Sequence, residues 1–178
     1  MADPFLIDRR SLMAGAILLV GGTLAGFPGE VLAHTPGAPR FFDPAEFALL
    51  EEIAGIVIPR TDTPGAREAG VPGFIDALMA DWASAERQGQ FRTLLAEIDG
   101  RAGGLRALPE AARFEAIRAF DAAAFAAPGG TWRKFKELLL TAYYLSEAGA
   151  TQELSYELSP GVWDAAVPVG PDTRAWAV

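Results

Sequence analysis

Few residues of this chain could carry out chemistry, and no cysteine is among them. Without cysteine the chain has no thiol nucleophile, no Cys-x-x-Cys-His attachment for haem and no ligands for an iron–sulfur cluster. The single histidine, His34, would be the first residue of the chain after cleavage behind Ala33, and chain termini are usually poorly ordered. The sequence therefore lacks the residues needed for a nucleophilic triad or for a zinc site with nitrogen or sulfur ligands.

Carboxylates remain as candidates for acid–base work. Glu51 and Glu52 are adjacent on an expected helix, on a face that we interpret as solvated. Asp62 is the best-placed acid because Thr61 and Thr63 flank it. We interpret Asp62 as a turn-fixing residue whose carboxylate accepts bonds from backbone N–H groups. The alternative is an independent exported enzyme or ligand-binding protein with its site around these three residues.

No phosphate-binding loop is evident in the sequence. The pair Gly103-Gly104 is not followed by the Lys and Ser/Thr that complete such a loop, and Gly21-Gly22 lies in an apolar N-terminal run. No flavin or nicotinamide fingerprint is present either. We therefore expect no catalytic, cofactor-binding or metal-binding residue in this chain.

The acid and its two threonines lie in a stretch full of residues that end helices, here called the corner loop (residues 58–70). Its proline at 59 removes a backbone donor and disfavours a helical conformation at the residue before it. The residues of the loop that favour turns are Pro59, Thr61, Asp62, Thr63, Pro64 and Gly65. Pro72 can then begin the next helix, where its missing N–H has no cost. The pattern predicts an ordered loop between two helices.

This motif, Ile-Pro-x-Thr-Asp-Thr-Pro-Gly-Ala followed by Ala-Gly-Val-Pro before a helix, resembles the gluconate 2-dehydrogenase subunit 3 family. The resemblance covers roughly residues 42–163. It implies a non-catalytic small subunit of a periplasmic dehydrogenase of sugars or sugar acids. It further implies a larger partner subunit that carries FAD, and a complex that often includes a multihaem cytochrome c subunit.

The N-terminal 33 residues resemble an export signal. Arg9 and Arg10 precede an uncharged run over residues 12–27, and small or apolar residues lead to a candidate cleavage point after Ala33. Paired arginines indicate the twin-arginine route, although Asp8 before them departs from its usual pattern and leaves the general secretory route open. A membrane anchor is the other alternative, but about 16 apolar residues fall short of the roughly 20 that a spanning helix needs.

The twin-arginine route carries proteins that are already folded, usually around a cofactor. Because this chain shows no cofactor site, the signal would serve a cofactor-bearing partner that has no signal of its own. This is the escort role that the resemblance implies. It predicts a periplasmic location, with attachment to the outer face of the inner membrane through the complex as an open possibility.

The remaining chain predicts an all-α single domain of about five helices over residues 34–149. Apolar residues recur at helical spacing, and breakers such as Gly103-Gly104 and the Pro128 to Gly130 run separate the segments. Expected helices begin after Asp43, at Pro72, near Glu86, at Leu108-Pro109 and at a capping Thr131, and Gly149 is expected to cap the last one. Phe114 and Leu145 are among the residues expected to face inward.

Residues 150–178 predict an extended tail with spaced aromatics, namely Tyr156, Trp163 and Trp176. Long segments without helical period are uncommon unless functional or bound. Two interpretations remain open: the tail wraps its own helices, or its aromatics anchor the partner subunit. The formal net charge of −8 argues against nucleic acid and anionic lipid as partners, since both require a basic surface.

Overall fold

The computed structural model describes residues 38–126, 130–155, 166, 168–170 and 173–176. Contacts divide the chain into two units, Met1–Ala38 and Pro39–Val178, and the description below concerns the second. Within the described residues the secondary structure is helical, apart from one isolated bridge between Ser155 and Trp176. The predicted all-α fold is confirmed.

Helix α3 (Pro44–Val57) begins where the sequence predicts it to begin. The Asp43 carboxylate accepts from the backbone N–H groups of Ala45 and Glu46, and the Glu46 side chain accepts in return from the Asp43 N–H. This reciprocal capping box satisfies donors that a helix start otherwise leaves unpaired. Pro44 occupies the first turn, where its missing N–H removes no helical bond.

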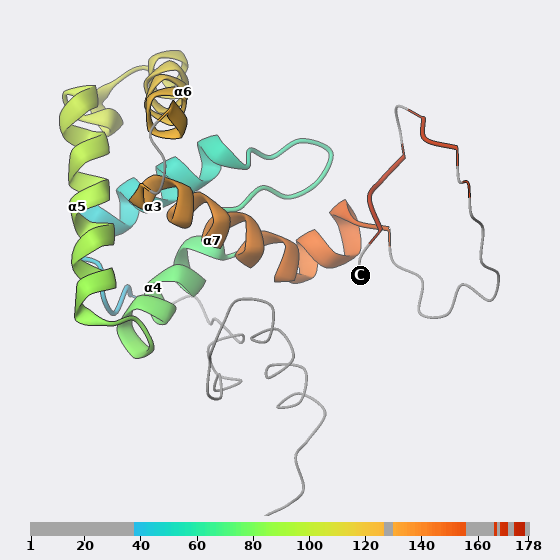
Figure 1. Ribbon diagram of the computed structural model, residues 1–178, viewed down its shortest axis with the longest axis horizontal. Helices are drawn as coiled ribbons and strands as arrows, with labels where there is room; N and C mark the ends of the chain where they lie inside the picture. Colours follow the sequence, from blue (N-terminus) through green and yellow to red (C-terminus); the bar gives the residue numbers. More distant parts are fainter. Residues whose placement is uncertain (1–37, 127–129, 156–165, 167, 171–172, 177–178) are drawn as a thin grey trace, which may run out of the picture. The chain divides into compact units, whose positions relative to one another are not determined.

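Helix α4 (Val71–Asp81) follows the loop and runs at a steep angle to the next helix, α5 (Ala85–Ala102) (Figure 1). Gly70 precedes α4 with φ of 73°, a left-handed conformation that favours glycine. Helix α5 ends at Gly103, also left-handed, and the Gly104 N–H returns to the Asp99 carbonyl. The glycine pair at 103 and 104 therefore ends a helix, as the sequence predicts.

Helices α6 (Glu110–Ala126) and α7 (Thr131–Leu145) complete the domain, and two predictions at the ends of α7 are wrong. Gly130 caps α7 with its extended backbone, so Thr131 is the first helical residue rather than the cap. Gly149 does not cap α7, because the helix ends at Leu145 and the Ser146 hydroxyl donates to the Tyr143 carbonyl instead.

Gly149 begins the short π-helical turn η2 (Gly149–Glu153), so the tail is not extended from its first residue. The backbone passes so close to α7 here that a Cβ on Gly149 would overlap the carbonyl oxygen of Tyr143. The glycine is thus required by close approach of two backbone segments, not by a left-handed cap.

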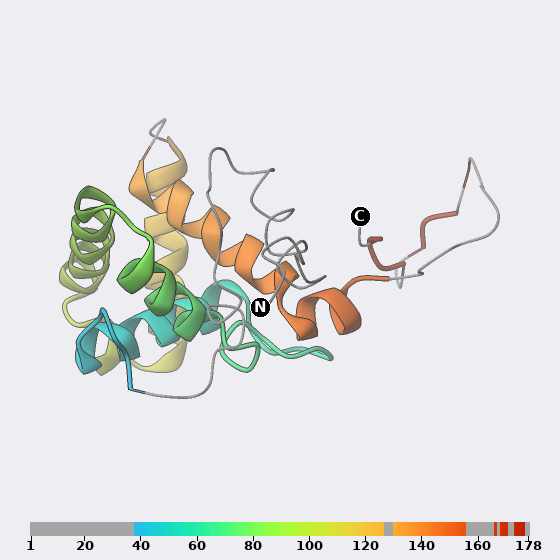
Figure 2. The same ribbon diagram turned by 90° about the horizontal axis from the view of Figure 1, so that it is seen from below.

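The core is formed where α3 and α7 each pack against α4, α5 and α6 (Figures 1 and 2). Aromatic rings from three helices meet there: Trp132 stacks on Phe135 at 5.7 Å and meets Phe120 edge-on at 5.4 Å. Phe91 contacts Phe135 edge-on at 5.5 Å. These contacts tie α5 and α6 to the N-terminal half of α7.

Two residues expected in the core are instead exposed. Phe114 is 52% exposed and Leu145 is 42% exposed. At 100° per residue, Phe114 lies about a quarter turn away from the stripe that carries Ile117 and Phe120. Leu145 lies about a third of a turn from the buried stripe of α7.

Candidate functional site

The corner loop folds back on itself between α3 and α4. The Ala66 N–H donates to the Ile58 carbonyl at 3.0 Å, and the Thr61 N–H donates to the Thr63 carbonyl at 3.1 Å. A Cβ on Gly65 would lie 2.7 Å from the carbonyl oxygen of Ile58, closer than real Cβ atoms approach backbone. Only glycine therefore permits this tight fold.

The loop is hydrogen-bonded to the end of α7 and to η2. The Tyr143 hydroxyl donates to the Pro64 carbonyl at 2.8 Å, and the buried Thr63 hydroxyl donates to the Glu153 carboxylate at 2.7 Å. These two bonds join segments that lie 79 and 90 residues apart in sequence. The Thr63 hydroxyl, a candidate for chemistry, is thus engaged in a structural contact.

Asp62 lies at the exposed tip of the loop, with 79% of its side chain accessible. The Thr61 hydroxyl donates to its Oδ1 at 3.0 Å, and Arg174 from the tail approaches Oδ2 at 3.4 Å. The Thr61 hydroxyl, with the backbone N–H groups of Asp62 and Thr63, holds the pKa of the Asp62 carboxyl below its ordinary value. The carboxylate is therefore ionised and solvated, which favours a surface role over a general acid or base.

Glu52 is not on a solvated face, contrary to the sequence-based interpretation. Only 17% of its side chain is exposed, and it accepts from Arg67 at 2.8 Å and from Arg113 at 2.7 Å. Burial raises the pKa of Glu52, but the hydrogen bonds and charges of Arg113 and Arg67 outweigh it and hold that pKa below the ordinary value. Arg67 also donates to the Glu51 carbonyl at 3.0 Å. Glu52 thus links α3 to the corner loop and to α6.

Asp76 is a buried carboxylate whose role the sequence did not indicate. It is 2% exposed and accepts from three consecutive backbone N–H groups, of Arg40 at 2.6 Å, Phe41 at 3.1 Å and Phe42 at 2.9 Å. The Arg40 guanidinium also pairs with Asp81, five residues further along α4. These contacts fix the segment that leads into α3 on the side of α4.

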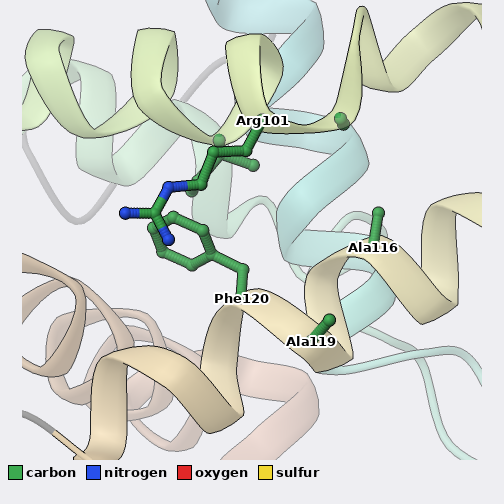
Figure 3. A pocket seen from close by; sticks show the side chains of 6 residues that line it. Arg101, Ala116, Ala119 and Phe120 are labelled. Carbon is green, nitrogen blue, oxygen red and sulfur yellow. The ribbon is translucent and has the colours of Figure 1, made fainter.

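A shallow cavity of about 210 Å³ lies between α5 and α6, away from the corner loop (Figure 3). It is lined by Ile98, Arg101, Ala102, Ala116, Ala119 and Phe120. The Arg101 side chain reaches across the Phe120 ring, 5.2 Å from its centroid, and pairs with Glu97 at 2.6 Å. None of the residues predicted for a site lines this cavity.

The tail is described only in part. Tyr156 and Trp163, like Arg9, Arg10 and Ala33 of the leader, lie outside the described residues. Trp176 is 53% exposed, and next to it the Ala175 carbonyl accepts from the Ser155 N–H at 2.8 Å. Its indole therefore presents a large apolar surface that the described residues do not cover.

Two further observations concern the described residues only. They contain no group of three or more His, Cys, Asp and Glu side chains placed to hold a metal ion. Among the helices in this part of the chain, none is long and apolar enough to cross a membrane.

Comparison with known proteins gives one match. The family model described as gluconate 2-dehydrogenase subunit 3 matches residues 44–161, from the first residue of α3 into the tail. No curated protein and no solved structure matches the chain. The matched region contains the corner loop and all five α-helices α3 to α7 of the described chain.

Proposed function

The chain belongs to the gluconate 2-dehydrogenase subunit 3 family, and from this premise we propose that it is the non-catalytic small subunit of a periplasmic, FAD-dependent sugar or sugar-acid dehydrogenase. In this role it stabilises the larger, flavin-bearing subunit and escorts it out of the cytoplasm by means of the leader. The observation that carries the proposal is the family match, which spans the whole helical domain. The flavin belongs to the larger subunit, and any haem c belongs to a third subunit.

The chemistry of the corner loop supports this proposal over an independent enzyme with a site at residues 61–63. The Thr63 hydroxyl is buried against Glu153, and the Thr61 hydroxyl donates to Asp62. Asp62 itself is solvated at the loop tip. Hydroxyl groups that are hydrogen-bonded within the protein stabilise its fold, whereas those of a catalytic site are available to bind a substrate.

Stabilisation by a small subunit requires only binding. A partner that binds the folded large subunit, and not its unfolded form, shifts the folding equilibrium by mass action. An all-helical domain with a packed aromatic core is a rigid partner for this purpose, because little conformational entropy is lost when it docks. The mechanism assigns no chemical step to this chain.

The test of the escort role is to co-express the full chain with its flavin-bearing partner and to replace Arg9 and Arg10 by lysine. We expect both polypeptides, and the dehydrogenase activity, to remain in the cytoplasm, since the paired arginines are the export address. The matched control replaces the exposed arginines Arg106 and Arg118 by lysine, which should leave export unchanged. Export of the partner despite the leader change would rule out the escort role.

A further inference from the structure

The exposed side of helix α7 carries apolar residues that a solvated helix face does not normally carry. Leu140 is 37% exposed and Tyr144 is 40% exposed, and they lie one turn apart on the same face. Leu145 follows at the end of the helix with 42% exposure. We call these three residues the α7 patch. Leu145 lies about 100° further round the helix than Tyr144, so the patch runs from the face of Leu140 and Tyr144 to the end of the helix. Exposed apolar side chains that gather at one place mark interaction surfaces more often than scattered ones do.

The opposite side of α7 is buried in the core of the domain. Trp132, Phe135, Leu139, Ala142 and Tyr143 are buried, and α7 packs through them against α4, α5 and α6. The helix cannot rotate to bury the α7 patch without exposing this larger set. The patch is therefore a fixed, second apolar surface of the same helix, not a core face that has slipped out of register.

The end of α7 that bears the patch is also held rigidly. Tyr143 donates to the Pro64 carbonyl, and η2, which packs on α7, is joined to the corner loop through Glu153 and Thr63. Figure 1 shows α7 continuing into this turn at the end of the domain. A preorganised surface loses little entropy on binding, so a small apolar patch here can anchor a partner.

The charges beside the patch indicate what kind of surface covers it. Glu137 lies one turn before Leu140, and Glu147 lies two residues beyond Leu145. Both glutamates are exposed, and within the described chain no ion pair engages either of them. The nearest basic side chain, Lys136 one turn before Leu140, is paired with Asp121 at 2.9 Å, and the exposed Lys134 lies further from Tyr144. A second copy of this chain, packed on the patch about a two-fold axis, would therefore bring Glu137 and Glu147 close to the same glutamates of the first copy.

We propose that the α7 patch is the docking surface for the larger dehydrogenase subunit, which meets it with an apolar surface edged by lysine or arginine. The proposal rests on the proposed function and names the part of this chain that performs it. Tyr144 is the central anchor, since tyrosine combines a large contact area with a hydroxyl that reaches the polar rim. Glu137 and Glu147 guide the approach of the basic partner surface and fix its orientation.

The experiment places a photo-reactive benzoylphenylalanine at position 144 of the full chain, co-expressed with the flavin-bearing subunit. The matched control places it at Phe114, an aromatic position on α6 that is more exposed than Tyr144 (52% against 40%). We expect a covalent product with the flavin subunit, identified by peptide mass, from position 144 and not from position 114. A product that joins two copies of this chain, or that joins position 144 to the chain's own tail, would overturn the proposal.

A second variant set measures affinity in the same complex. Leu140→Ser with Tyr144→Ser removes the exposed apolar surface and also the edge-on contact of Tyr144 with the buried Tyr143 at 5.4 Å. The full chain should therefore melt somewhat lower but stay folded, while its affinity falls at least about tenfold. Phe114→Ser is the control and should bind as the unchanged chain does. If all variants retain the partner equally, the α7 patch is not the interface while the proposed function stands. If the unchanged chain binds no flavin subunit at all, the proposed function fails and this inference fails with it.

Discussion

Replacing Asp76 by alanine should be among the most destabilising single changes in this domain. The side chain is 2% exposed, and its carboxylate accepts three backbone N–H bonds from residues 40–42. A hydrogen bond to a charged group contributes about 1.5–3 kcal/mol, and a buried donor left without a partner costs about 1–3 kcal/mol. Water can reach the partly buried N–H groups of Arg40 and Phe41, so only the Phe42 N–H bears the full penalty.

The expected loss is about 3–5 kcal/mol in the free energy of unfolding. For a domain of this size, about 2–4 °C of melting temperature corresponds to each kcal/mol, so the midpoint should fall by about 6–20 °C. Asp76→Asn keeps one acceptor oxygen, but its NH₂ group would face a backbone N–H, which is also a donor. The free energy of unfolding of this variant should therefore lie between those of Asp76→Ala and the unchanged protein. The assay is thermal and urea unfolding followed by circular dichroism.

Asp81→Ala is the matched control, because Asp81 lies on the same helix and bonds the same residue, Arg40, through the exposed guanidinium. Exposed ion pairs contribute little to stability, so this variant should melt close to the unchanged protein. Hydrogen exchange gives a local measure: the Phe42 amide should lose protection in Asp76→Ala and keep it in Asp81→Ala. Equal melting of the two variants would refute the argument that Asp76 anchors the entry to α3.

Three other predictions concern residues on which the fold and the loop depend. Glu52→Gln should lower stability above about pH 4.5, and the difference from the unchanged protein should disappear as the pH falls through the lowered pKa of Glu52, which pH-dependent unfolding can measure. Gly149→Ala should cost about 2 kcal/mol or more in urea unfolding because of the backbone overlap, whereas Gly100→Ala, with open space around it in α5, should gain about 0.5–1 kcal/mol. Asp62→Ala should leave dehydrogenase activity of the assembled complex unchanged, and a collapse of activity with normal assembly would make Asp62 catalytic.

Local chemistry made the start of α3 and the end of α5 predictable. The capping box at Asp43 and Glu46 involves residues three apart, and the left-handed stop at Gly103 needs only the conformational freedom of glycine. The same local reasoning failed at Gly149, where the cause is the approach of two backbone segments. A glycine near a helix end is required in either case, and the sequence does not distinguish the two causes.

The contacts of the buried charged residues could not be predicted from the sequence. Asp76 bonds residues 34 to 36 positions away, and Glu52 pairs with arginines 15 and 61 positions away. No periodicity links such positions, because their proximity results from how the helices pack rather than from any one element. A carboxylate within a mostly apolar helical segment, as Asp76 is between Ile75 and Ala77, is the signal that could have indicated a buried acceptor.

The two proposed activities of this chain reside in different units, and this makes them separable. The export address lies in residues 1–33, while the α7 patch belongs to the unit formed by Pro39–Val178. Binding through a rigid helix face does not require the leader, so a chain that has lost it should still stabilise the flavin subunit in the cytoplasm. Conversely, a chain with an altered patch should still be exported, but without its partner. Loss of both functions from a patch variant that melts normally would mean that export depends on the assembled complex, and that partner binding precedes recognition of the leader.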